Sequence, residues 1–133
     1  MQRIYSSQDV CPVARTLDVL GDRWTILVIR DLLRGVNRFS DLEQSLAGIS
    51  PNLLAARLKR LEKAGMVERA FYSEHPPRAE YRLTHKGREF GAVVRAMYAW
   101  GKKHEPRRRR GKEIAASCRG NFGRTRAANQ YDA

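Results

Sequence analysis

The sequence predicts a mainly α-helical domain that carries one small β-hairpin, and three observations support this fold class. Apolar residues recur at the spacing of an α-helix in several segments bounded by proline, glycine and capping residues. Residues 67–73 and 79–84 have the composition of β-strands, and the prolines of the loop 74–78 are expected to lie outside the strand ladder. The length of 133 residues suits a single domain with a modest core.

The first two helices are expected at residues 12–20 and, after an N-cap at Asp22, up to about Gly35. Pro12 occupies the first turn, where proline is favoured, and Gly21 stops the first helix. The second segment is apolar on nearly all sides, which is typical of a helix at the centre of a small domain.

Two further segments have the layout of a helix-turn-helix. Ser40 begins a capping-box pattern that predicts a short helix ending near Leu46. A short connection that contains a glycine follows. Ser50 and Pro51 then have the types favoured at the N-cap and first turn, which predicts the next helix over residues 51–64.

The helix expected at residues 51–64 has two distinct faces. Leu54, Leu58 and Leu61 follow helical spacing and form an apolar seam. The opposite face and its flanks are small, polar or cationic: Asn52, Ala55, Ala56, Lys59, Arg60 and Lys63. A cationic helix followed at once by a β-hairpin suits duplex DNA, because the helix can enter the major groove while the hairpin loop reaches the flanking backbone.

The last helix is expected to begin after the capping residue Thr84 and to end before Pro106. It carries apolar residues that include Met97, Tyr98 and Trp100. A core this small cannot bury the apolar surface of both the first and the last helix. We therefore expect these two helices, the first and the fifth, to form the interface of a homodimer.

The chain is strongly basic, with a net charge of +12 and a pI near 10.5. Such a charge indicates a polyanionic partner, either nucleic acid or an anionic membrane surface. Residues 1–106 carry 18 Lys and Arg against 12 Asp and Glu, and residues 107–133 carry 8 against 2, so each part has a net charge of +6. We expect a folded domain over residues 1–106 and a basic, disordered tail over residues 107–133. No apolar run reaches the roughly 18 residues of a membrane span.

The sequence gives no support for catalysis, a metal site or a cofactor. His75, His85 and His104 are scattered without cysteine or carboxylate neighbours at ligand spacing, and no phosphate-binding glycine loop or hydrolase motif occurs. Cys11 and Cys118 lie at opposite ends of the chain, which is no disulfide framework. Together with the lack of a signal-peptide core, this favours a cytoplasmic protein that is not an enzyme.

Short motifs along residues 10 to 104 follow one another in a recognisable order: Cys11-Pro12-Val13, Gly21-Asp22-Arg23-Trp24-Thr25, Arg38-Phe39-Ser40-Asp41-Leu42, Ile49-Ser50, Leu54, Arg57-Leu58, Leu61-Glu62, Gly65, Pro76-Pro77-Arg78, Tyr81-Arg82-Leu83-Thr84, Gly87 and Trp100-Gly101. In these motifs the chain resembles the HxlR-type transcriptional regulators, winged helix-turn-helix relatives of the MarR group. The resemblance implies a homodimer that binds operator DNA and represses or activates nearby genes. The tail after Pro106 is not part of the pattern.

Side chains near the start of a recognition helix usually meet the bases, which here are Ser50, Pro51, Asn52, Ala55 and Ala56. Asn52 can pair bidentately with adenine. Lys59 and Arg60, further along, are better placed for phosphates. The alternative is a solvated basic face on an ordinary amphipathic helix.

Four residues outside that face need separate assignments. Arg57 lies beside the leucine seam, where an internal ion pair joining the two helices of the helix-turn-helix is favoured over a DNA contact. Arg38 is expected to form a short β-bridge with the wing and to clamp a phosphate. His75 and Arg78, in the wing, are candidates for the minor groove or the sugar-phosphate backbone, and an exposed turn with incidental charge is the alternative.

Cys11 is a candidate redox sensor. Its sulfur would lie near the N-terminus of the first helix, where partial positive charge and Arg15 favour a thiolate that oxidants or electrophiles attack. The resemblance adds weight, because a cysteine at this place is a redox switch in some family members. The alternative is a small hydrophobe that packs the first helix. Cys118 has no such context.

We interpret the chain as a sequence-specific DNA-binding regulator, a repressor acting as a homodimer on a pseudo-palindromic operator, with a small molecule or an oxidant as inducer. A different class remains open: a non-specific nucleic-acid-binding or architectural protein whose affinity resides in the basic tail. The specificity ratio between operator and random DNA separates the two. A protein-interaction module that has lost DNA binding is a third reading, against which the cationic helix face argues.

Overall fold

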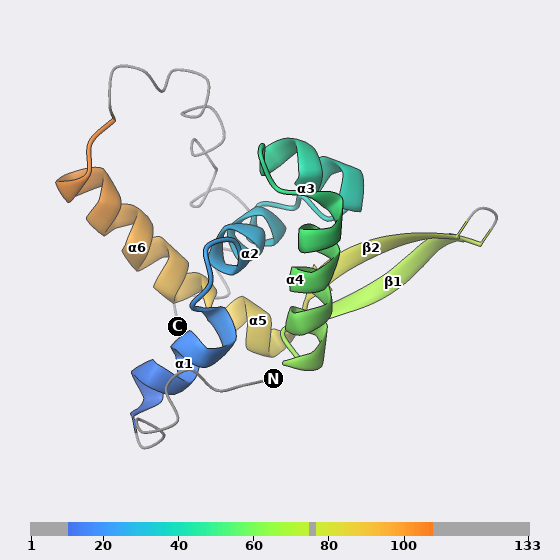
Figure 1. Cartoon of the computed structure of the whole chain (residues 1–133). Helices are drawn as coiled ribbons and strands as arrows, with labels where there is room; N and C mark the ends of the chain where they lie inside the picture. The colour runs from blue at the N-terminus through green and yellow to red at the C-terminus, as the bar shows by residue number, and fades with distance from the viewer. Residues whose placement is uncertain (1–10, 75–76, 108–133) are drawn as a thin grey trace.

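The computed structural model describes the backbone of residues 11–74 and 77–107 and the side chains of residues 11–72 and 78–107. In chain order its elements are α1 (Pro12–Leu20), α2 (Thr25–Leu33), α3 (Phe39–Ser45), α4 (Pro51–Lys63), β1 (Val67–Glu74), β2 (Pro77–Leu83), α5 (His85–Glu89) and α6 (Gly91–His104). Figure 1 shows α2 at the centre, α3 and α4 on one side of it, the hairpin projecting beyond α4, and α6 leaving on the opposite side. The predicted mainly helical fold with one hairpin is confirmed. The expected tail lies, apart from Arg107, outside the described residues.

α1 begins and ends where the sequence predicts. Pro12 occupies the first turn after an extended Cys11, and the N–H of Gly21 closes the helix on the Leu17 carbonyl at 2.7 Å. The helix buries Ala14 and Leu20 but leaves Val13 and Leu17 exposed. Much of its apolar side therefore faces solvent in the single chain.

α2 begins at Thr25 with Trp24 in the N-cap position, so the predicted N-cap at Asp22 was two residues too early. Asp22 is followed by a turn, and its Oδ1 accepts the N–H groups of Trp24 and Thr25, each at 3.0 Å. Thr25, Val28 and Ile29 are fully buried. The prediction that this helix forms the centre of the domain is confirmed.

α3 does not use the predicted capping box. The helix begins at Phe39, with Arg38 in the N-cap position and no side-chain cap, so Ser40 lies inside the first turn. The reason is tertiary. Arg38 forms an antiparallel bridge with Glu80 of β2, as the sequence predicted, and the helix starts directly after this extended residue.

α4 is the helix that the sequence defines best. Ser50 Oγ accepts the N–H of Leu53 at 3.2 Å, which confirms the cap. At the other end Gly65 has a φ of +74°, a conformation that strains any residue with a Cβ. The leucine seam is buried almost completely, and three leucines removed from water stabilise this packing by about 5–9 kcal/mol. The seam therefore determines which face of α4 is turned outward.

The two strands pair antiparallel from Val67 with Leu83 to Glu74 with Pro77. The expectation that both prolines lie outside the ladder was wrong for Pro77, which is the first residue of β2. A first residue of a strand tolerates proline because its missing N–H need not join the ladder. The pairing shifts register between Phe71 and Ser73, so the wing contains a β-bulge.

The predicted last helix is divided at Phe90 into α5 and α6. Thr84 caps α5 as expected, since its Oγ1 accepts the N–H of Gly87 at 3.2 Å. A Cβ at Gly87 would lie 2.1 Å from the Met66 carbonyl oxygen, so α5 is packed tightly against the turn between α4 and β1. α6 instead packs on α2, where it buries Gly91 and Val94. One straight helix cannot satisfy both packings, and the chain turns between them (Figure 1).

This contact predicts opposite effects for two glycine substitutions. Gly87→Ala should lower the free energy of unfolding by about 1–3 kcal/mol, because the new methyl group meets backbone. Gly101 lies within α6, and no atom lies close to the position that a Cβ would take there. Gly101→Ala should therefore raise the free energy of unfolding by about 0.5–1 kcal/mol. Urea unfolding of both variants measures this, and a Gly87→Ala protein as stable as the wild type would contradict the packing.

Candidate nucleic-acid interface

The outward face of α4 is the centre of the candidate interface. The residues predicted to meet bases, together with the first predicted phosphate contact, are all exposed on it: Ser50, Pro51, Asn52, Ala55, Ala56 and Lys59. The structure thus brings this predicted set together on one helix, beside α3 and at the base of the hairpin (Figure 1).

The inward side of α4 is held by a cluster of charges around Asp22. Arg57 Nε lies 3.3 Å from Asp22 Oδ1, and Arg60 Nη1 lies 3.6 Å from Asp22 Oδ2. The Thr25 hydroxyl donates to the same carboxylate, and Arg60 also donates to the Asp18 carbonyl of α1. Asp22 therefore links the start of α2 to α4, and Arg60 links α4 to α1.

Two opposing effects act on the pKa of Asp22. Partial burial raises it, but hydrogen bonds from the Thr25 hydroxyl and from the N–H groups of Trp24 and Thr25, together with the charge of Arg57, lower it below the ordinary value of 3.8. Asp22 is therefore a charged partner for both arginines at neutral pH.

The assignments of the two arginines need revision. The internal ion pair expected for Arg57 exists, but its partner is Asp22 at the start of α2 and not a residue of α3. Arg60, predicted to contact phosphate, has a side chain only 19% exposed and directs its guanidinium at Asp22 and Asp18. Sequence reasoning missed this because Asp22 is distant in the chain, although both arginines adjoin the leucine seam.

Arg38 lies at the base of the wing. Its side chain is 53% exposed, its Nε lies 4.0 Å from Glu80 Oε1, and its guanidinium lies 4.7 Å from the centre of the Tyr72 ring. Arg78 is exposed in β2. His75 lies outside the described residues, and no pattern in the sequence distinguishes Tyr72 as a site residue.

Cys11 occupies the N-cap position of α1. It is partly buried and forms no disulfide among the described residues, and its carbonyl accepts the N–H of Arg15 at 3.0 Å. Cys118 lies outside the described residues.

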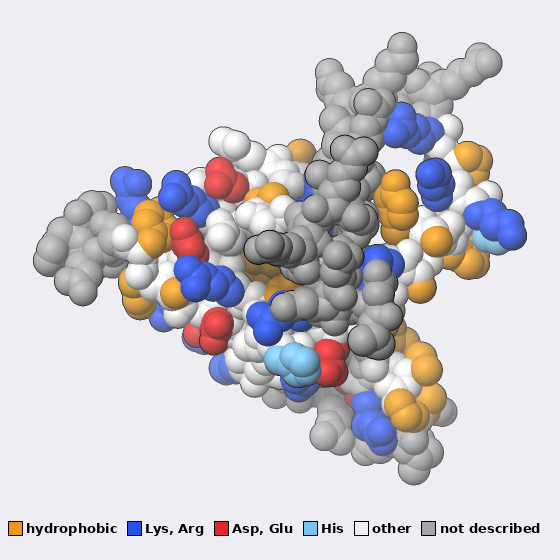
Figure 2. All heavy atoms as spheres, turned by 180° about the vertical axis from the view of Figure 1, so that it is seen from behind, with side chains coloured by type: hydrophobic (Ala, Val, Ile, Leu, Met, Phe, Trp, Pro, Cys, Tyr) orange, Lys and Arg blue, Asp and Glu red, His pale blue; other side chains and the backbone are white. Residues whose placement is uncertain are grey.

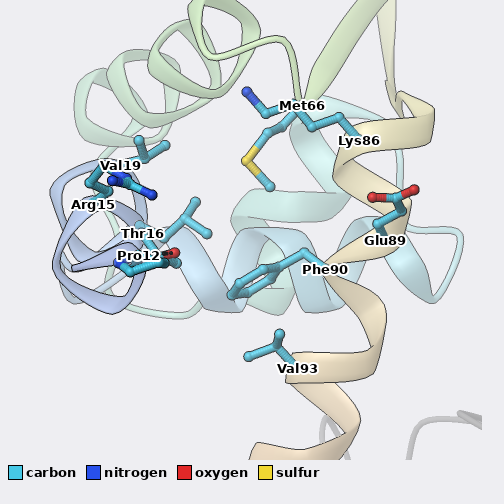
Figure 3. A pocket seen from close by; sticks show the side chains of 10 residues that line it. Pro12, Arg15, Thr16, Val19, Met66, Lys86, Glu89, Phe90 and Val93 are labelled. Carbon is cyan, nitrogen blue, oxygen red and sulfur yellow. Dashed lines mark hydrogen bonds between the residues drawn. The ribbon is translucent and has the colours of Figure 1, made fainter. Parts of the chain in front are cut away.

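A groove with a volume of about 440 Å³ lies between α1 and the start of α6. It is lined by Pro12, Arg15, Thr16, Val19, Leu20, Met66, Lys86, Glu89, Phe90 and Val93. Figure 3 shows Phe90 and Val93 directed across it toward α1 and Met66 at its inner end. The groove thus extends from α1 to Met66, in the turn between α4 and β1.

α1 and α6 also carry much of the exposed apolar surface: Val13, Leu17, Val93, Met97, Tyr98 and Trp100. In Figure 2 hydrophobic side chains are visible on the outer parts of the molecule, among Lys and Arg. Within residues 11–74 and 77–107, no group of three or more His, Cys, Asp or Glu could hold a metal ion. No helix in the same part of the chain is long and apolar enough to cross a membrane.

A buried seam, an outward face at the start of α4 and a hairpin wing define a winged helix-turn-helix DNA-binding domain. Residues 19–109 match the model of the HxlR-like helix-turn-helix family. The chain is 40% identical over 97 residues to an HTH-type transcriptional regulator of Synechocystis, which covers 73% of this chain and 72% of the relative. It spans 60% of the length of mycobacterial relatives that it matches at 41% identity. The chain therefore belongs to the HxlR-like helix-turn-helix family of transcriptional regulators.

Solved structures agree with this membership. The oxidised form of the redox regulator HypR superposes with a TM-score of 0.66 at 35% identity, over 70% of this chain and 96% of that one. The reduced form of the transcriptional regulator YodB from Bacillus subtilis gives a TM-score of 0.61 at 38% identity, over 74% of this chain and 98% of that one. The predicted fold class and the resemblance are confirmed.

The Asp22 cluster predicts a large and pH-dependent stability effect. Asp22→Ala should lower the free energy of unfolding by about 2–4 kcal/mol, because it removes the acceptor of the Trp24 and Thr25 N–H groups and leaves two arginines without their carboxylate. Asp41→Ala, an exposed acid in the first turn of α3, should change it by no more than about 0.5 kcal/mol.

The pH dependence has a defined sign. Because the folded-state pKa of Asp22 is lowered, its charge contributes full stability above 3.8 and loses it as the pH falls through the folded-state pKa. The stability difference between wild type and Asp22→Asn should therefore be constant near neutrality and shrink in acid. A difference that grows as the pH falls would contradict this assignment.

Proposed function

We propose that this chain is a sequence-specific repressor that binds a pseudo-palindromic operator as a homodimer. The observation that carries the proposal is the exposed start of α4, whose small and polar side chains face outward while the leucine seam fixes the helix from behind. A regulator of transcription acts on the chromosome, so we keep the cytoplasm as its proposed location.

The outward face divides into base readers and backbone anchors. Asn52 is the proposed reader of adenine, and Ala55 and Ala56 supply methyl groups that can contact thymine. Lys59 is the proposed phosphate anchor on this helix. Arg60 is reassigned as a positioning residue, because its guanidinium is bound by Asp22 and Asp18.

We further propose that the exposed apolar residues of α1 and α6 form the dimer interface. Val13, Met97 and Trp100 are among the most exposed apolar side chains described, and burying them between two copies would remove this surface from water. Two-fold symmetry presents the same patch twice, so each copy would contribute one α4 to the operator.

A non-specific architectural protein is the second candidate. It is favoured by the charge of +6 in residues 107–133, which would bind any DNA through counterion release. The two candidates differ in the contribution of Asn52 to DNA affinity. A purely electrostatic binder gains no affinity from this uncharged side chain, whereas a sequence-specific regulator does.

Two sites are candidates for the inducing signal. HypR, one of the similar structures, is a redox regulator, and Cys11 at the start of α1 is the thiol that an oxidant would reach. The groove between α1 and α6 is the alternative, because a small molecule bound there would contact both α1 and Met66, in the turn between α4 and β1. In either case α1 would transmit the signal.

Asn52→Ala should weaken binding to operator DNA by about 1–3 kcal/mol and leave binding to random DNA nearly unchanged. Lys59→Ala should weaken both similarly and reduce the slope of log K against log salt by about one. Titrations of both variants on the two DNAs at several salt concentrations measure this. If the two variants behaved alike on both DNAs, the division into readers and anchors would be wrong.

Oxidation should weaken operator binding if Cys11 is the sensor. Diamide joins two thiols in a disulfide by accepting their two hydrogens, so treated wild-type protein should release operator DNA and recover it with a reducing agent. Cys11→Ser should bind as the reduced protein does and lose the response. Cys118→Ser shows which disulfide forms. The variant should keep the response if the bond joins the Cys11 thiols of two copies, and lose it if the bond joins Cys11 to Cys118. If oxidation did not change operator binding by the wild type, Cys11 would not be the sensor, and the groove would be the proposed inducer site.

A further inference from the structure

The wing exposes two adjacent aromatic side chains that packing does not explain. Phe71 is 60% exposed and Tyr72 is 41% exposed, although the base of the same hairpin buries Val67 and Leu83. In Figure 2 hydrophobic side chains lie beside Lys and Arg along the projecting wing. Neighbouring aromatics left in water beside cations indicate a surface that meets a partner.

The β-bulge sets Tyr72 apart from its neighbours. Phe71 pairs with Ala79 and Ser73 pairs with Arg78, so Tyr72 has no opposite residue in β2. A bulged residue is released from the alternation of the strand, and bulges are a common means of redirecting a side chain at a functional site.

Arg38 is fixed against this tyrosine from the other edge of the wing. Its backbone forms the bridge to Glu80, and the neighbouring Asn37 carbonyl accepts the N–H of Tyr81 at 2.8 Å. The guanidinium lies 4.7 Å from the centre of the Tyr72 ring. This stacking and the bridge reduce the freedom of a long side chain that is otherwise half exposed.

In Arg38 and Tyr72, the side-chain atoms that have no hydrogen-bond partner among the described residues are hydrogen-bond donors. Arg38 turns Nε toward Glu80 at 4.0 Å, and its terminal nitrogens have no hydrogen-bond partner among the described residues. The Tyr72 hydroxyl has none in that part of the chain either. Glu80 is shared with Arg82, at 3.4 Å, so these three charged groups sum to a net charge of +1. Donors with a positive charge select an anion.

We infer that Arg38 and Tyr72 together form a binding site for one backbone phosphate of duplex DNA, in which the guanidinium and the phenol hydroxyl each donate to a phosphate oxygen. This inference rests on the proposed function and adds Tyr72 to its residues. The position fits, because Arg38 begins α3, and the first helix of a helix-turn-helix crosses the DNA backbone.

A structural brace is the competing explanation. In that case Tyr72 would serve only as a platform on which Arg38 stacks, tying the wing to α3. The ring alone suffices for a brace, whereas phosphate binding needs the hydroxyl. Tyr72→Phe keeps the ring and removes only the hydroxyl, so it separates the two roles.

The test uses full-length protein on a fluorescently labelled random-sequence duplex and on an operator duplex found by footprinting. Tyr72→Phe should lower affinity for both about threefold to tenfold with an unchanged melting temperature. Arg38→Ala should lower affinity by about tenfold and reduce the salt slope by about one. Lys102→Ala removes the same charge from an exposed position in the last turn of α6 and should change neither quantity appreciably.

A neutral methylphosphonate placed at each operator phosphate in turn locates the contact. At one phosphate in each half-site, the methylphosphonate should weaken binding by the wild-type protein. The same methylphosphonate should not weaken binding by Arg38→Ala or Tyr72→Phe any further. The inference is overturned if Tyr72→Phe binds like the wild type, or if no phosphate shows this loss of additivity. The random-duplex measurement keeps the test informative if no operator exists, because phosphate binding does not require base readout. Failure of the proposed function would instead appear as equal affinity of the wild type for both duplexes.

Discussion

The carboxylate of Asp22 is the contact on which the orientation of α4, the proposed recognition helix, depends. It accepts the N–H of Thr25 at the start of α2 and pairs with the guanidinium groups of Arg57 and Arg60 from α4. Rotating α4 about its axis would separate these partly buried charges, and their attraction therefore opposes the rotation. The leucine seam opposes the same rotation. The cationic outer face is therefore presented in one orientation, and α1 is tied to it through the Asp18 carbonyl.

The C-terminal end of α4 is joined by hydrogen bonds to the residues that follow β2. Thr84 donates its hydroxyl to the Gly65 carbonyl at 2.6 Å and its N–H to the Met66 carbonyl at 3.0 Å, and Lys86 Nζ binds the Ala64 carbonyl at 2.7 Å. These bonds give partners to the carbonyl of the C-cap residue and to the carbonyls of the two residues that follow it. β1 therefore starts from the turn in which α4 ends, and the structure holds the proposed recognition helix and the wing in one fixed arrangement.

Local signals in the sequence were sufficient for much of this architecture. The caps and stops of α1 and α4 depend on neighbours in the chain, and the structure has Pro12, Ser50 and Gly65 in the predicted roles. Long-range contacts decided the remainder. The start of α3 follows from the Arg38 bridge, the partner of Arg60 lies in a distant segment, and the bulge at Tyr72 depends on strand register. No local pattern encodes these three features.

The central claim is that two rigidly held copies of α4 read two half-sites of one operator. Hydroxyl-radical footprinting on the DNA that flanks the protein's own gene tests it most directly. We expect two protected segments related by a two-fold axis, with centres about one helical turn, roughly 34–36 Å, apart. Protection spread evenly along the duplex, or a single protected segment without a symmetric mate, would contradict the claim.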